Sequence, residues 1–203
     1  MKIICIGRNY VEHAKELNHP LPATPVFFMK PESALVRGNL PFFYPSFSNE
    51  IHYEVEIVFY INKVGRNISV KHANTYYSGI GLGLDFTARD LQQEAKQKGL
   101  PWEIAKAFDS SAPVSEFIPV EEFDDINNIT FSLFKNEVKV QEGNTSQMIF
   151  NIDRIISYVS RFVTLKMGDM IFTGTPAGVG PITIGDKLEG YIGERKMLLC
   201  NVR

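Results

Sequence analysis

The chain has 203 residues, of which 44% are hydrophobic and 22% charged, and its formal net charge is −2. These values are ordinary for a soluble globular protein, and so small a net charge gives no support for binding to nucleic acid or to an anionic membrane. No apolar run reaches the ~20 residues that a membrane span needs. We therefore expect one cytoplasmic catalytic or binding domain over residues 1–203, with neither nucleic acid nor a membrane as a partner.

Short apolar runs separated by turn residues dominate the chain from its first residues to its last. Asn136 and Glu137 fit a two-residue hairpin loop, and Asn151 fits a helix N-cap. The excess of strands, with helices at the margins, predicts an α+β, β-rich fold rather than a doubly wound parallel sheet. In chain order, the predicted strands are 2–6, 26–29, 53–61, 79–84, 129–134, 138–141, 169–173 and 197–202, and the predicted helices are 10–17, 69–79, 87–99 and 151–162.

Two acids lie two residues apart in the apolar run 53–61. Side chains two apart on a strand share a face, so Glu54 and Glu56 are expected side by side. Two neighbouring carboxylates repel each other, and a strand gains nothing from them. Their charge therefore needs a bound cation, a nearby Lys or Arg, a shared proton or open water.

A third acid, Asp85, follows the glycine-rich apolar run that ends at Leu84. A side chain at such a strand end is fixed by a rigid element and faces an open edge. Three carboxylates without a nearby Cys or His indicate a hard cation such as Mg²⁺, Mn²⁺ or Ca²⁺. The alternative is that Asp85 caps the following helix while the two glutamates are solvated.

Two further patterns fit catalytic groups. Lys106 lies between Ala105 and Ala107, where its ammonium can balance an acidic cluster or contact a substrate oxygen. The alternative, which the residues alone favour, is that the ammonium reaches water. His13 and Glu16 are three apart on a predicted helix, where a carboxylate can orient an imidazole as a general base. An exposed pair of little consequence is the favoured alternative from spacing alone.

Several glycines and one arginine suggest anion binding. The run 174–180 lacks the Gly-Lys-Ser/Thr of a P-loop, but its backbone can bind a small carboxylate or simply form tight turns. Arg8 follows the first strand and can clamp a substrate carboxylate, although a surface arginine is the ordinary interpretation. Cys5 and Cys200 are expected to be reduced core thiols rather than a disulfide.

Six separated motifs together resemble the fumarylacetoacetate hydrolase superfamily across nearly the whole chain. The greatest similarity is to its short acylpyruvase and oxaloacetate decarboxylase type, and the hydroxyheptadienedioate isomerases are similar too. The motifs are Ile6-Gly7-Arg8-Asn9-Tyr10-Val11-Glu12-His13, His52-Tyr53-Glu54-Val55-Glu56, Leu84 to Gln92, Gly99 to Lys106, Met148-Ile149-Phe150 and Thr173 to Gly180.

The resemblance implies a mixed β-roll, a homodimer and a Mg²⁺ or Mn²⁺ cofactor. It implies that Glu54, Glu56 and Asp85 ligate the metal, and that His13 and Glu16 form a water-activating dyad on a lid. It also implies that Lys106 lines the same pocket and that the substrate is bound by Arg8, Gln92, Gly174 and Thr175.

The implied chemistry is metal-assisted cleavage of a C–C bond in a small 2-oxo acid. Hydrolysis of an acylpyruvate and decarboxylation of oxaloacetate both leave pyruvate as an enolate, whose charge a divalent cation stabilises. The alternative is an isomerase or tautomerase of unsaturated 2-oxo diacids such as 2-hydroxyhepta-2,4-diene-1,7-dioate. We expect the wall that selects the distal part of the substrate to come from the loops 18–25 and 37–47.

Overall fold

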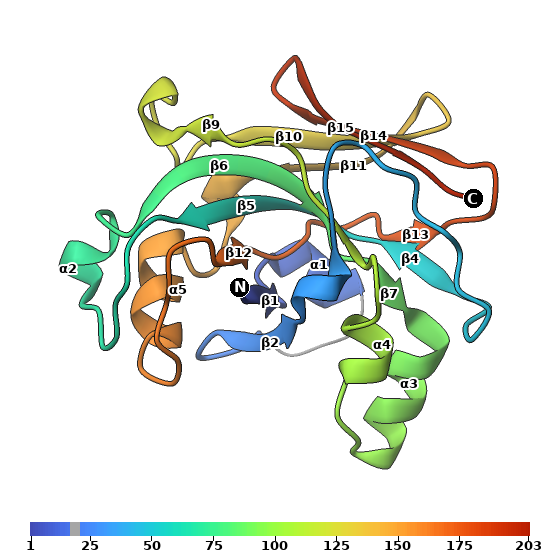
Figure 1. Cartoon of the computed structure of the whole chain (residues 1–203), viewed down its shortest axis with the longest axis horizontal. Coiled ribbons are helices and arrows are strands. Elements are labelled where there is room, and N and C mark those ends of the chain that lie inside the picture. Colours follow the sequence, from blue (N-terminus) through green and yellow to red (C-terminus); the bar gives the residue numbers. More distant parts are fainter. Residues whose placement is uncertain (17–20) are drawn as a thin grey trace.

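Two β-sheets lie one over the other in this molecule (Figure 1). The computed structural model describes residues 1–16 and 21–203, with the side chains of residues 13–15 excepted. The first sheet is mixed, because β1 runs parallel to β12 while its other pairs are antiparallel. In sheet order it consists of β2 (Val26–Lys30), β1 (Ile3–Gly7), β12 (Met170–Phe172), β5 (Val55–Ile61), β6 (Tyr77–Leu84) and β9 (Ile118–Pro119).

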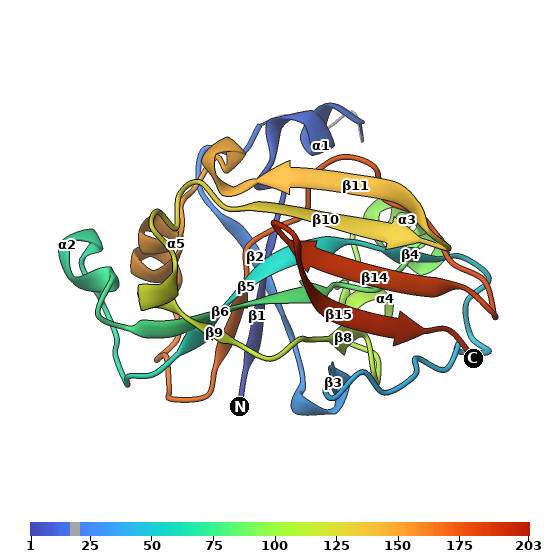
Figure 2. The same cartoon turned by 90° about the horizontal axis from the view of Figure 1, so that it is seen from above.

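The second sheet is antiparallel and crosses β5 and β6, as the view from above shows (Figure 2). Buried Phe131 and Leu188 from this sheet join Phe59 and Leu82 in one hydrophobic core. Gly190 permits the close approach, because a Cβ there would lie 2.5 Å from Leu82 Cδ2. In sheet order the strands are β11 (Val138–Asn144), β10 (Thr130–Lys135), β14 (Lys187–Ile192) and β15 (Arg195–Asn201).

Shorter elements complete the described part of the chain. Figure 1 shows α2 and α5 at one end of the sheets, and α3 and α4 at the other. Two small sheets contain β13 (Gly180–Pro181), β4 (Ile51–Tyr53) and β7 (Thr87–Ala88), and β3 (Leu35–Val36) with β8 (Ala112–Pro113). The helices are α1 (Val11–Glu16), α2 (Val70–Ala73), α3 (Arg89–Lys98), α4 (Glu103–Lys106) and α5 (Ile152–Val159), with 3₁₀ turns η1 (Glu32–Ala34), η2 (Val120–Glu122) and η3 (Thr145–Gln147).

The α+β, β-rich prediction is confirmed, and local signals located several elements. Asn136 and Glu137 join β10 to β11 with φ angles of 51° and 71°, which a type I′ hairpin turn requires. Asn151 caps α5 by accepting the Arg154 N–H at 3.1 Å. Cys5 and Cys200 are buried and form no disulfide, in agreement with the expected core thiols.

Two element predictions are wrong. The helix expected over 69–79 is only the single turn α2, because the chain from Tyr77 onward pairs with β5 instead. The long register along β5 supplies more hydrogen bonds and core contacts than a short isolated helix, so tertiary pairing overrides local propensity. The strand expected over 53–61 is interrupted at Glu54, which separates β4 from β5.

Within the described residues no helix is long and apolar enough to span a membrane.

Candidate active site

Three carboxylates meet where two neighbouring strands change sheets. The chain passes from β4 to β5 at Glu54, and from β6 towards β7 at Asp85. The Glu54 carbonyl accepts the Asp85 N–H at 2.8 Å, which ties the two crossings together. One oxygen from each of Glu54, Glu56 and Asp85 lies within 4.8 Å of the others, and all three residues are buried. Asp85 does not cap α3, whose N-cap position is Ala88.

Buried cationic side chains contact this cluster directly. Lys106 Nζ lies 2.8 Å from Glu54 Oε2 and 2.8 Å from Asp85 Oδ2, and Arg89 Nη2 lies 2.6 Å from Glu54 Oε1. Burial lowers the pKa of Lys106, but Asp85 and Glu54 outweigh it, so the net pKa is raised. Lys106 is therefore a protonated site residue, and the interpretation of its head as solvated is wrong.

Glu56 has a strongly perturbed carboxyl. Burial first, and then the charges of Asp85 and Glu54, raise its pKa well above the ordinary value, although Gly174 donates its N–H to Oε2 at 2.6 Å. A buried carboxyl beside two others keeps a proton unless another positive charge arrives. Buried lysine and arginine side chains therefore balance part of the cluster's charge, and the raised pKa of Glu56 favours a proton on that carboxyl. These are two of the four arrangements expected from the sequence.

The donor set fits a hard divalent cation. All three residues offer carboxylate oxygens, which Mg²⁺ and Mn²⁺ prefer, and none offers sulfur or nitrogen. Asp85 Oδ1 is buried and accepts no hydrogen bond from the described residues, although Lys30 Nζ lies 2.8 Å away as an ion pair of poor hydrogen-bond geometry. These residues could hold a metal without breaking a hydrogen bond to that oxygen.

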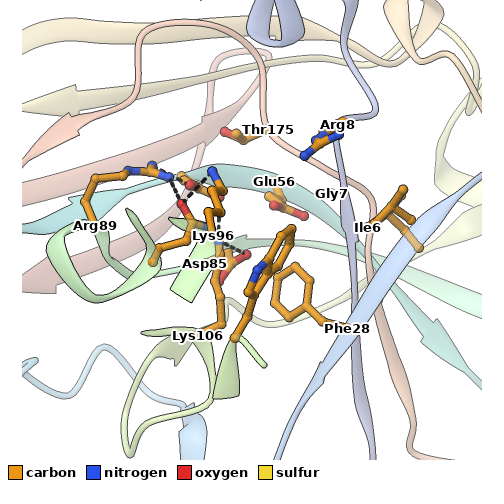
Figure 3. A pocket seen from close by; sticks show the side chains of 14 residues that line it. Ile6, Gly7, Arg8, Phe28, Glu56, Asp85, Arg89, Lys96, Lys106 and Thr175 are labelled. Carbon is orange, nitrogen blue, oxygen red and sulfur yellow. Dashed lines mark hydrogen bonds and ion pairs between the residues drawn. The ribbon is translucent and has the colours of Figure 1, made fainter. Parts of the chain in front are cut away.

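Positively charged side chains surround the carboxylates in the pocket. Arg8, Lys96 and Arg89 line it together with Lys106, and Figure 3 shows them around Glu56 and Asp85. Burial and the neighbouring charges of Arg89 and Arg8 lower the pKa of Lys96. Arg8 has a φ of 60°, a left-handed conformation that is rare for this residue type and occurs at functional turns.

Polar groups expected to hold substrate are engaged with the protein. Gly174 N–H donates to Glu56, and the Thr175 hydroxyl donates to the Val55 carbonyl at 2.9 Å while it accepts from Gln141 at 2.9 Å. Gln92 accepts from Arg89 at 2.7 Å. Thr175 and Gln92 line the pocket, and their contact with substrate remains a prediction.

The expected dyad is described only in part. Glu16 ends α1, and its carboxylate accepts the Gly178 N–H at 3.1 Å. The contact joins the helix to the glycine-rich run 174–180. The side chain of His13 lies outside the described residues, as does Leu17, so the pairing of His13 with Glu16 remains a prediction.

Sequence reasoning missed several residues around the site. Arg89 and Lys30 pair with the carboxylates, and Phe28 and Trp102 are apolar residues that line the pocket. The wall expected from the loops 18–25 and 37–47 remains a prediction. Asn9 ties the turn after β1 to the site segment by donating to the Thr173 carbonyl at 2.7 Å. The available signal was a lysine closing the apolar run Val26–Lys30, since a charge there needs a buried partner.

Comparison with known proteins identifies the family. Residues 2–201 match the model described as fumarylacetoacetate (FAA) hydrolase C-terminal. The chain belongs to the fumarylacetoacetate hydrolase family. Similar family members include a mitochondrial oxaloacetate decarboxylase of Dictyostelium discoideum, which is 46% identical over 93% of this chain and 87% of the relative. An oxaloacetate tautomerase of Escherichia coli is 45% identical over 92% of this chain and 86% of the relative.

Solved structures of the family have the same architecture. The fumarylpyruvate hydrolase of Pseudomonas aeruginosa, in complex with Mn²⁺ and pyruvate, has a TM-score of 0.94 and 38% identity, over 100% of this chain and 89% of that chain. A 2-hydroxyhepta-2,4-diene-1,7-dioate isomerase of Mycobacterium marinum has a TM-score of 0.86 and 34% identity, over 99% of this chain and 73% of that chain. The fumarylacetoacetate hydrolase-like fold is therefore confirmed, and the chain is a member of an enzyme family with an acidic candidate metal site.

Proposed function

We propose that this family member is a divalent-metal-dependent enzyme of oxaloacetate that interconverts its keto and enol forms, with decarboxylation to pyruvate as a related outcome. The observation that carries the proposal is the trio of buried carboxylates facing a cationic pocket wall. Oxaloacetate appears in the names of the relatives from Dictyostelium discoideum and Escherichia coli. Both reactions require negative charge to develop on the same keto oxygen.

Glu54, Glu56 and Asp85 would hold Mg²⁺ or Mn²⁺, the latter named for the structure of the fumarylpyruvate hydrolase. The cation would act as a Lewis acid towards the carboxylate and keto oxygens of a 2-oxo acid. Its two positive charges would also replace the proton that Glu56 otherwise keeps. The three carboxylates thus account for both the raised pKa of Glu56 and the expected cofactor.

The pocket wall favours a dianion. Among the described lining residues, three carboxylates face the four cationic side chains of Arg8, Arg89, Lys96 and Lys106. A divalent cation increases the positive excess, which a substrate with two carboxylates offsets better than an acylpyruvate with an uncharged tail. We assign the distal carboxylate of oxaloacetate to the side of the pocket where Lys96 and Arg8 lie.

Lys106 is the side chain best placed to stabilise the enolate. An ammonium has three N–H donors, and Glu54 and Asp85 accept two of them. We assign the third to the keto oxygen, whose negative charge grows as the C3 proton or carbon dioxide leaves. The raised pKa of Lys106 keeps it cationic at neutral pH, so the hydrogen bond is charge-assisted. His13, oriented by Glu16, is our candidate for the base that moves the C3 proton.

A second candidate function is the hydrolysis of acylpyruvates, for which the same His13 would activate water. The contact of Glu16 with Gly178 supports it, because α1 then lies against a segment that also supplies Thr175 to the pocket. Isomerisation of 2-hydroxyhepta-2,4-diene-1,7-dioate is the alternative for a diacid, and a structural relative carries that name.

We also propose that the single-domain chain forms a homodimer and that it is cytoplasmic. Light scattering of the purified protein tests the homodimer.

One set of assays separates these functions. Metal-free protein is supplied with Mn²⁺ or Mg²⁺ and given oxaloacetate, acetylpyruvate or the heptadienedioate. Loss of enol absorbance without pyruvate indicates tautomerisation, pyruvate with carbon dioxide indicates decarboxylation, and pyruvate with acetate indicates hydrolysis. We expect oxaloacetate to be the preferred substrate. Turnover of none of the three substrates in the presence of metal would contradict the proposal.

A further inference from the structure

Lys30 is a buried cation behind the candidate metal site. It ends β2, its side chain is 0% exposed, and it is not among the residues that line the pocket. A buried ammonium is costly unless acceptors replace its water. Its contacts therefore reveal what the fold uses this charge for.

The ammonium of Lys30 contacts the segments that carry Asp85 and Lys106. Its Nζ lies 2.8 Å from Asp85 Oδ1 and donates to the neighbouring Phe86 carbonyl at 3.1 Å. It also donates to the backbone carbonyl of Lys106, at the end of α4, and to Ser111 Oγ at 2.9 Å. Ser111 Oγ in turn donates to the same Lys106 carbonyl at 3.1 Å.

These contacts fix two groups that must keep their relative positions. Lys30 forms an ion pair with Asp85 Oδ1 and Lys106 donates to Oδ2, so the carboxylate lies between two ammonium groups. The Lys106 backbone is held from behind by Lys30 while its side chain reaches forward to Glu54 and Asp85. Lys30 thus couples the orientation of a candidate metal ligand to that of the candidate enolate-stabilising lysine.

We infer that Lys30 is a positioning residue that orients Asp85 for metal binding, and that it sets metal affinity without touching substrate. The inference rests on the proposed function. Partners behind metal ligands typically account for ~10–100-fold in metal affinity, because they fix the direction of the donor oxygen. This gain outweighs the repulsion between the ammonium and the cation, since Lys30 also offsets part of the negative charge of the buried carboxylate cluster.

The test compares Mn²⁺ binding to metal-free wild type and K30M by calorimetry and by the electron paramagnetic resonance spectrum of the bound ion. We expect K30M to bind Mn²⁺ about 10–100-fold more weakly, with an altered spectrum. S111A removes one acceptor of Lys30 and keeps the ion pair, so a smaller loss of less than about tenfold is expected. S111A decides the question if K30M does not fold.

A matched control is K2M. Lys2 Nζ lies 2.6 Å from the buried Asp169, and this ion pair contacts none of the described site residues. K2M should therefore lower stability but leave Mn²⁺ affinity unchanged. Mn²⁺ binding by K30M that equals or exceeds that of wild type overturns the inference. A loss of Mn²⁺ affinity in K2M equal to that in K30M also overturns it. Where K30M does not fold, unchanged Mn²⁺ binding by S111A overturns it. If wild type itself binds no Mn²⁺, the proposed function fails rather than the role of Lys30 alone.

Discussion

Lys106 Nζ donates to Asp85 Oδ2 at 2.8 Å although 21 residues separate the two in sequence. The contact joins the end of α4 to the crossing between β6 and β7, and the same ammonium also reaches Glu54 at 2.8 Å. A lysine with two carboxylate partners is held in one place and stays protonated. The pocket therefore contains a fixed positive charge next to its candidate metal site.

Replacing Lys106 with methionine should lower kcat for oxaloacetate by about 10²–10³-fold. The variant keeps the volume of the side chain but loses the donor that we assign to the keto oxygen. Steady-state kinetics at saturating Mn²⁺ measure the effect, and K98M, at an exposed lysine paired with Glu94, is the control. A K106M enzyme with wild-type kcat would show that the ammonium only balances charge.

Replacing Asp85 with asparagine should abolish tight Mn²⁺ binding and turnover together. The amide has nearly the same shape but supplies a neutral oxygen, so the cation loses one of its three anionic ligands. Calorimetry with Mn²⁺ and the oxaloacetate assay measure the two properties on one preparation. D153N is the control, because Asp153 is a half-buried acid that hydrogen-bonds Tyr77 at 3.1 Å outside the site. Mn²⁺ affinity equal to that of wild type in D85N would contradict the assignment.

The metal-free protein should become less stable as pH rises above about 4.3, the ordinary glutamate pKa. Burial, reinforced by Asp85 and Glu54, raises the folded-state pKa of Glu56, so the folded protein binds a proton that the unfolded chain has released. The free energy of unfolding therefore falls with pH until Glu56 ionises in the folded state. Saturating Mn²⁺ should remove this slope by replacing the proton.

Urea unfolding from about pH 5 to about pH 8, with and without Mn²⁺, measures the slope. E56Q cannot titrate at this position, so its metal-free stability should vary less with pH than that of wild type. The same pH dependence in wild type and E56Q would assign the proton to another group.

Replacing Lys96 with methionine should discriminate between substrates. We expect KM for oxaloacetate to rise about 10–100-fold, the value of a charge-assisted hydrogen bond to the distal carboxylate. KM for acetylpyruvate, which has no distal carboxylate, should change little. Parallel kinetics on the two substrates measure the difference, and an equal effect on both would place Lys96 at the shared 2-oxo carboxylate.

Local sequence patterns predict part of the candidate site. The two-residue spacing of Glu54 and Glu56, and the position of Asp85 at a strand end, predicted three acids close together, and the structure brings their oxygens within 4.8 Å. Period-two alternation holds along β5, where Val55, Ile57 and Phe59 enter the core. The spacing of Glu54 and Glu56 and the alternation along β5 depend on local backbone geometry, which short-range sequence determines.

The partners of those acids come from distant segments and leave little local signal. Arg89 reaches Glu54 across 35 residues, and Lys30 reaches the Phe86 carbonyl across 56. Their pairing follows from the sheet topology, which no single window of sequence encodes. The same reason explains why the helix over 69–79 was wrong, because pairing with β5 decides the state of Tyr77 to Gly79.

The most direct test of the metal centre is a titration of metal-free protein with Mn²⁺ in which bound metal and oxaloacetate turnover are measured on the same samples. We expect turnover to be absent at the start and to rise in proportion to bound Mn²⁺, up to one ion per chain. Chelation should reverse the gain. Undiminished turnover by thoroughly chelated protein would contradict the proposal that Glu54, Glu56 and Asp85 act through a divalent cation.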